Sequence, residues 1–151
     1  MSSIIKLVNI NSVNYYDYEN DLKSDGMLRD LWVFDSILTD WQSVLDALAK
    51  VYKFKYMEDG KDVSVLPSAK EIHAIRENKR PSISFEIGIM IANSFFVCTE
   101  EIDFDFGHKD ILPETFPDLV KFMSLICRSV NKQVALTHEG NRDDIIIAVT
   151  P

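Results

Sequence analysis

The sequence predicts an α+β fold: a single domain in which a mostly antiparallel sheet carries three helices. Two observations lead to this prediction. A strand, a capped helix and two short strands follow one another over 29–66, and the same order of elements returns over 102–149. Residues 82–106 are rich in isoleucine and phenylalanine and contain turn signals typical of a strand meander. We therefore interpret the chain as a duplicated strand–helix–strand–strand unit around one sheet.

The size of the chain indicates one core. It has 151 residues, of which 46% are hydrophobic, which is enough for one good core and too little for two independent domains. We divide it into an N-terminal segment, 1–28, and an α+β domain, 29–151. In the segment, 4–10 is expected to be a short strand. No period of 2 or 3.6 runs through 11–26, so we expect a loop or arm there.

The N-terminal arm is rich in tyrosine and in acidic residues. Tyr15, Tyr16 and Tyr18 lie among Asp17 and Glu19. Tyrosine is enriched at binding hot spots, so the three rings are protein-contact candidates. The simpler alternative is that the arm packs its rings against its own domain.

Three helices are predicted from their start signals. Thr39 to Gln42 matches a capping box, and an apolar stripe at helical spacing continues to Tyr52. Ser68 to Glu71 matches a second capping box at the start of a short helix that ends before Pro81. The third helix is expected over 115–130 with a proline in its first turn, and apolar residues cover most of its circumference. It should be the most buried helix, with Ser124 and Arg128 on its exposed face.

The strands are predicted from β-branched and aromatic runs between turn residues. Glycines at 60, 88 and 140 suit the turns of three hairpins. The expected strands lie at 30–35, 54–58, 62–66, 83–87, 90–97, 102–106, 133–137 and 144–149.

Charge and cysteine content limit the class of partner and compartment. The chain has 16 lysines and arginines against 24 aspartates and glutamates, a formal net charge of −8. This excess disfavours nucleic acid and anionic membranes as partners and favours a basic protein partner, or else serves solubility alone.

Cys98 and Cys127 lie far apart in apolar runs, which disfavours a disulfide scaffold. Without a signal peptide or an apolar run of membrane-spanning length, a cytoplasmic location is expected.

The acidic stretch from Glu100 to Phe106 carries the best candidate site. It alternates acidic and apolar residues, so Glu101, Asp103 and Asp105 share the face opposite the core. Carboxylates two residues apart on a strand are about 7 Å apart, close enough to hold a cation or meet arginines. Three interpretations follow: a solvated strand face, a protein-contact patch, and a metal or catalytic site.

Motifs for catalysis or for cofactors are not found in the sequence. The three histidines are scattered without metal-ligand spacing, and no serine lies in a Gly-x-Ser-x-Gly elbow. The glycines are isolated, so no phosphate-cradling loop is expected. We therefore expect no catalytic residue, no cofactor and no metal.

Several segments carry a resemblance to known proteins. They are Thr39 to Gln42, the Asp59-Gly60 turn, Leu66-Pro67, the stretch from Phe95 to Asp105, and Gln133 to Thr137. Over roughly 29–151 the chain resembles a group of small, functionally uncharacterised bacterial proteins. It is also loosely similar to the immunity proteins of polymorphic toxin systems. The bacterial group has no activity to carry over, whereas the similarity to immunity proteins implies a protein that binds and neutralises a toxin domain.

Two classes of function remain in contention. A non-enzymatic, protein-binding module fits the acidic balance and the small size, and an immunity protein that covers a basic toxin surface is one form of it. The alternative is a small-ligand-binding protein or an enzyme whose site is assembled from residues distant in the sequence.

Overall fold

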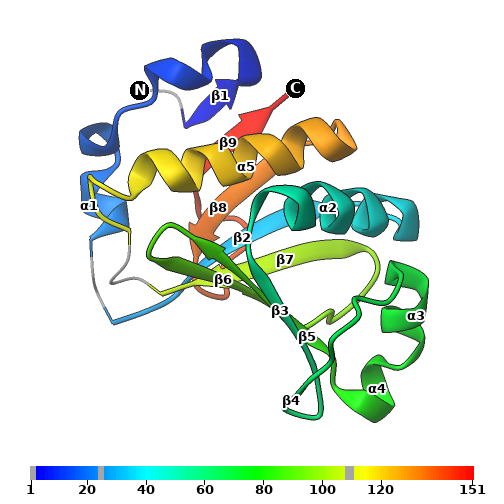
Figure 1. The fold of residues 1–151 in the computed structure, drawn as a ribbon. Helices are drawn as coiled ribbons and strands as arrows, with labels where there is room; N and C mark the ends of the chain where they lie inside the picture. The colour runs from blue at the N-terminus through cyan, green and yellow to red at the C-terminus, as the bar shows by residue number, and fades with distance from the viewer. Residues whose placement is uncertain (1–2, 24–25, 108–110) are drawn as a thin grey trace.

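The computed structural model describes residues 3–23, 26–107 and 111–151. They form an α+β fold around a nine-stranded mixed sheet with the strand order β1-β9-β8-β2-β7-β6-β5-β3-β4 (Figure 1). All neighbouring strands are antiparallel except β1 and β9, which are parallel. The strands are β1 (Ile4–Lys6), β2 (Arg29–Phe34), β3 (Phe54–Glu58), β4 (Lys61–Asp62), β5 (Ser82–Ile87), β6 (Met90–Ser94), β7 (Glu101–Phe106), β8 (Val134–His138) and β9 (Ile145–Thr150).

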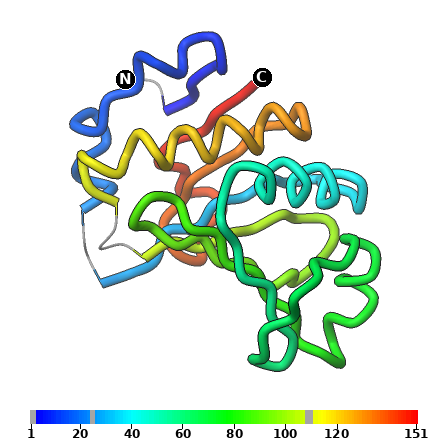
Figure 2. Tube along the Cα trace, viewed as in Figure 1, coloured from blue at the N-terminus to red at the C-terminus, as the bar shows by residue number. Residues whose placement is uncertain are grey.

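Helices cover one face of this sheet. The two long ones, α2 and α5, pack against each other in front of the strands in the view of Figures 1 and 2. The helical segments are the 3-10 helices η1 (Leu7–Ser12) and η2 (Tyr15–Asp17), and α1 (Glu19–Leu22), α2 (Leu38–Val51), α3 (Ala69–Ala74), α4 (Arg76–Lys79) and α5 (Phe116–Val130). The prediction of three helices is therefore too low, because α1, α4 and the 3-10 helices were not expected.

The core lies between α5 and the central strands. Phe122 is fully buried and contacts the rings of Phe104 and Phe106 edge-on, with centroids 5.4 and 5.8 Å away. Tyr52, which follows α2, contacts the same ring at 5.5 Å. Phe122 thus joins both long helices to β7. The expectation that the third helix is the most buried agrees with its eight buried residues, against four in α2.

Local signals explain some helix starts and not others. The capping box at Ser68 is confirmed, since its hydroxyl accepts from the Glu71 backbone N–H at 3.2 Å. The box expected at Thr39 is not formed, because α2 begins one residue earlier and Asp40 accepts from the Ile37 N–H at 3.0 Å. Gln42 instead accepts from the backbone N–H of Ala69 at 2.7 Å, which links α2 to the start of α3.

The meander and its hairpin turns are present with small shifts. Gly88 has a φ of +61°, a backbone conformation that favours glycine, and a Cβ there would lie 2.7 Å from a carboxylate oxygen of Asp118, whose side chain would have to move. β6 ends at Ser94 and not at 97, because the chain turns at Phe96 with a φ of 53°. The strand expected over 62–66 is reduced to Lys61–Asp62.

The N-terminal segment is folded and shares the main core. Only Ile4–Lys6 of the expected strand is extended, and 7–12 is a 3-10 helix. Tyr15, Tyr18 and Leu22 belong to the same hydrophobic cluster as the sheet. The arm expected as a loop is therefore helical in part, although residues 24 and 25 of it lie outside the described residues.

The predicted duplication is not confirmed by the topology. Both units contain a strand, a crossover helix and a hairpin. However, β2 separates β7 from β8, whereas β7, β6 and β5 all separate β2 from β3. The two units therefore bury their helices on one sheet without equivalent strand neighbours.

The burial of Phe122 and Leu45 leads to a stability prediction. Replacing either of these fully buried side chains by alanine should lower the free energy of unfolding by about 2–5 kcal/mol, since a cavity is left in the core. Urea denaturation followed by circular dichroism measures this. Ile89→Ala, at a position 70% exposed, is the control and should change stability little. A loss below about 1 kcal/mol in both core variants would contradict the single-core arrangement.

Candidate functional site

The face of the sheet opposite α2 and α5 carries an acidic and aromatic patch. Its residues come from the strands β2, β6 and β7, where every second side chain points away from the helices. We call it the open-face patch; it consists of Asp30, Trp32, Phe34, Asn93, Glu101, Asp103 and Asp105. All seven are partly exposed, whereas the alternate residues of β2 and β7 are buried in the core.

Strand register brings the carboxylates of the patch together. β2 and β7 are antiparallel neighbours at the centre of the sheet, and Asp30 lies directly opposite Asp105. Trp32 lies opposite Asp103, and Phe34 opposite Glu101. Side chains that face each other in this way have Cβ atoms about 5 Å apart, so the patch concentrates negative charge.

A polar row extends the patch across β6 and β5. The amide of Asn93 donates to a carboxylate oxygen of Asp105 at 3.4 Å. The Ser84 hydroxyl in turn donates to the Asn93 carbonyl oxygen at 2.7 Å. These bonds orient the Asp105 carboxylate but supply no positive charge.

The loop between β8 and β9 folds over one side of the patch. The backbone N–H of Gly140 donates to a carboxylate oxygen of Asp30 at 2.9 Å. Arg142 forms an ion pair with Glu101, and its guanidinium carbon lies 5.4 Å from the centroid of the Trp32 ring. The chain thus places one of its own arginines on both the acidic and the aromatic part of the patch.

The aromatic part of the patch is held in place by two contacts. Trp32 and Phe34 stack with centroids 5.8 Å apart and an interplanar angle of 13°. The indole N–H of Trp32 donates to the Thr137 hydroxyl at 3.0 Å on the neighbouring strand β8. The ring is therefore oriented before anything binds to it, which lowers the entropy cost of using it as a contact.

Three carboxylates of the patch, those of Asp30, Asp103 and Asp105, resist ionisation. Burial, followed by the negative charges of neighbouring carboxylates, raises the pKa of Asp103 from its ordinary 3.8 to about 6. Burial also raises the pKa of Asp105 and of Asp30, although hydrogen bonds from Asn93 and Gly140 act in the opposite direction. Among the described residues, neither Asp103 nor Asp105 has an ion-pair partner. Within the described part of the chain, an ion pair compensates the negative charge of the patch only at Glu101.

The sequence-predicted contact residues fall into two groups. Glu101, Asp103 and Asp105 share the open face as expected from strand alternation. In the N-terminal arm, Tyr15 and Tyr18 are 8% and 7% exposed and lie in the core. Tyr16, at 65%, is the one tyrosine of the three that is available at the surface.

Other residues of the patch were not singled out from the sequence. Asp30, Trp32 and Phe34 alternate with core residues of β2 in the same way as the acidic residues of β7, and this pattern was visible. Their position beside Asp103 and Asp105 depends on the pairing of two strands about 70 residues apart, which no local pattern reveals. Arg142 could not be identified as part of the patch from the sequence, because it lies in a loop 41 positions from its ion-pair partner Glu101.

Neither a metal centre nor a membrane helix is seen in the part of the chain that the structure describes. No group of three or more His, Cys, Asp or Glu side chains there could hold a metal ion. Among the described helices, none combines the length and the apolar character needed to cross a bilayer. Cys98 and Cys127 are both free thiols.

Comparison with protein-family models, with curated proteins and with solved structures finds no match. The argument for function therefore depends on the geometry and chemistry of the open-face patch.

The raised pKa of Asp103 makes a prediction for stability. The pKa of Asp103 is higher in the folded protein than in the unfolded chain, so on lowering the pH the folded protein takes up the proton before the unfolded chain does. Above about pH 6 the carboxylate is charged and destabilises the fold. Asp103→Asn should therefore raise the free energy of unfolding at pH 8 by about 1–2 kcal/mol, which allows for partial solvent screening. The gain should shrink as the pH falls from about 6 towards 4, because the folded wild-type protein takes up the proton on Asp103 in this range while the unfolded chain stays largely ionised.

Urea denaturation at pH 8, 6 and 4.5 measures this dependence. Asp46→Asn, at an exposed position on α2, removes a carboxylate away from the patch and is the matched control. An unchanged or lower stability of Asp103→Asn at pH 8 would show that Asp103 is not under electrostatic strain.

Proposed function

We propose that the protein is a non-enzymatic protein-binding module that uses the open-face patch to bind a basic protein. The observation that carries the proposal is the group of half-buried carboxylates around Asp103, which the described residues leave largely uncompensated beside a partly exposed, oriented tryptophan. Charges held in this way lower the stability of the free protein. Cationic side chains of a partner would reverse that effect on binding, because they favour the ionised carboxylates.

The contacts of Arg142 support a partner rich in arginine. A guanidinium fits the patch by pairing with Glu101 and lying over Trp32, and Arg142 already makes both contacts. Asp103 and Asp105 follow Glu101 on the same face of β7 and are partly exposed, so further cations can pair with them. Arginine and tryptophan are also the residue types most enriched among interface hot spots.

We further propose that the partner is a toxin domain and that this chain is its cytoplasmic, bacterial immunity protein. The net charge of −8 and the resemblance noted in the sequence support this form of the binding function. A toxin that acts on nucleic acid or on another anionic substrate needs a basic surface, and an acidic protein face can block that surface. Tyr16, exposed on the N-terminal arm, is a second contact candidate.

The binding proposal makes a mutational prediction. Cross-linking and affinity capture from cells that produce the protein would supply the partner, which is then purified and tested directly. The Asp103→Asn/Asp105→Asn variant should bind it with an association rate lower by about tenfold or more, because electrostatic steering is lost. Stopped-flow kinetics at two salt concentrations measures the rate, and the wild-type rate should fall more steeply with salt.

A double variant elsewhere on the surface is the matched control. Asp46→Asn/Glu77→Gln removes the same amount of charge from exposed positions on α2 and α4. Equal rates for wild type and both double variants would contradict a role for the patch. Equal losses in both double variants would mean that net charge, and not the open-face patch, steers the encounter.

A further inference from the structure

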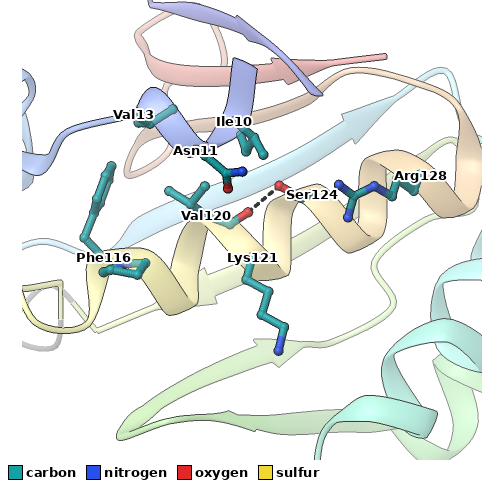
Figure 3. A pocket seen from close by; sticks show the side chains of 9 residues that line it. Ile10, Asn11, Val13, Phe116, Val120, Lys121, Ser124 and Arg128 are labelled. Atoms are coloured by element: carbon teal, nitrogen blue, oxygen red, sulfur yellow. Dashed lines mark hydrogen bonds between the residues drawn. The ribbon is translucent and has the colours of Figure 1, made fainter. Parts of the chain in front are cut away.

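A groove lies between the N-terminal 3-10 helix η1 and the outer side of α5, away from the open-face patch. Its volume is about 390 Å³, within the range of small-molecule sites. Figure 3 shows Asn11 pointing from η1 towards α5, and Val120, Ser124 and Arg128 along the facing side of the helix.

The spacing of residues on α5 creates this groove. Pro117, Val120, Ser124 and Arg128 follow one another at helical intervals, so they form one stripe along the helix. Ser124 is 3% exposed, and its hydroxyl donates to the Val120 carbonyl at 2.7 Å. The expectation that Ser124 lies on the exposed face is therefore wrong. A small side chain at this position leaves space that a leucine or methionine would fill.

The two ends of the groove differ in chemistry. One end is apolar and is lined by Val13, Phe116 and Val120. The other end carries the Arg128 guanidinium, and the Asn11 amide lies between the two ends, near Val120 and Ser124; Lys121 stands at the rim and extends away from Asn11 (Figure 3). Among the described residues, Arg128 and Lys121 have no ion-pair or hydrogen-bond partner through their side chains.

We propose that this groove binds an amphipathic carboxylate, whose apolar body lies against Phe116 and Val120 and whose carboxylate pairs with Arg128 and Asn11. Charge complementarity selects the ligand class. The Arg128 guanidinium lines the groove of a chain whose net charge is −8, with Lys121 at the rim, and an apolar surface continues from Arg128. Arginine binds a carboxylate through two parallel hydrogen bonds, which fixes the orientation of the ligand. This inference is independent of the function proposed for the open-face patch.

Octanoate is the probe for the test, added to ¹⁵N-labelled full-length protein at pH 7.5 and followed by amide chemical shifts. We expect saturable shift changes confined to residues 10–13 and 116–128. Octan-1-ol keeps the apolar body without the charge, and acetate keeps the charge without the body, so both should bind much more weakly than octanoate. Octanoate should also raise the melting temperature, because it binds only the folded state.

Two variants test the geometry. Arg128→Gln should weaken octanoate binding about tenfold or more, because a charge-assisted contact is lost. Arg80→Gln, at an exposed arginine that follows α4, is the matched control and should bind as wild type does. Ser124→Leu should abolish binding by filling the groove. If that variant does not fold, the Arg128→Gln comparison still decides the question.

Three results would overturn the proposal. Equal affinity of wild type and Arg128→Gln would show that the guanidinium does not receive the carboxylate. Equal binding of octan-1-ol and octanoate would show that the groove is only an apolar surface. Shift changes that do not saturate, or that lie outside the groove, would mean that octanoate does not occupy it.

Discussion

The packing of two helices on a single face of the sheet is the constraint on which the rest of the structure depends. Phe122 of α5 contacts Phe104 and Phe106 of β7, and Tyr52 next to α2 closes the same cluster. Since side chains alternate along a strand, this cluster places every second residue of β7 on the face of the sheet opposite α2 and α5. The same holds for β2, whose Leu31 and Val33 are fully buried. The open-face patch is therefore a direct consequence of how the core is packed.

The patch carries an electrostatic cost that the fold tolerates. Asp30, Asp103 and Asp105 lie on two adjacent central strands, where burial and mutual repulsion disfavour their ionised forms. Hydrogen bonds from Gly140 and Asn93 and the ion pair of Arg142 offset part of this cost. Neutral residues at these positions would make a more stable sheet, so the carboxylates support a role in recognition.

The two sides of the molecule offer opposite chemistry. The open-face patch is acidic and aromatic and suits a basic macromolecular surface. The groove between η1 and α5 is smaller, apolar at one end and cationic at the other, which suits a small anion with an apolar body. The groove also depends on the N-terminal arm, because η1 forms one of its walls while Tyr15 and Leu22 tie the arm to the core. Ligand binding there would strengthen the attachment of the arm to α5.

The sequence alone determined the features that depend on neighbours along the chain. The alternation over 101–106 predicted which face Glu101, Asp103 and Asp105 share, and the Ser68 cap and the Gly88 turn were also predicted correctly. Each of these is set by strand alternation or by hydrogen bonds within a few residues. The cap of α2 was misplaced, because Asp40 competes with Thr39 for the free backbone donors and also pairs with Lys132 at 2.7 Å.

Only the tertiary structure decided which distant segments meet. The pairing of Asp30 with Asp105, the guanidinium of Arg142 over Trp32, and the burial of Tyr15 and Tyr18 all join parts of the chain far apart in the sequence. The α+β class was read from the elements, but their order in the sheet was not, and the apparent repeat concealed two different crossovers. The physical reason is that strand order and register depend on how the whole core is packed. Local periodicity in the sequence does not determine them.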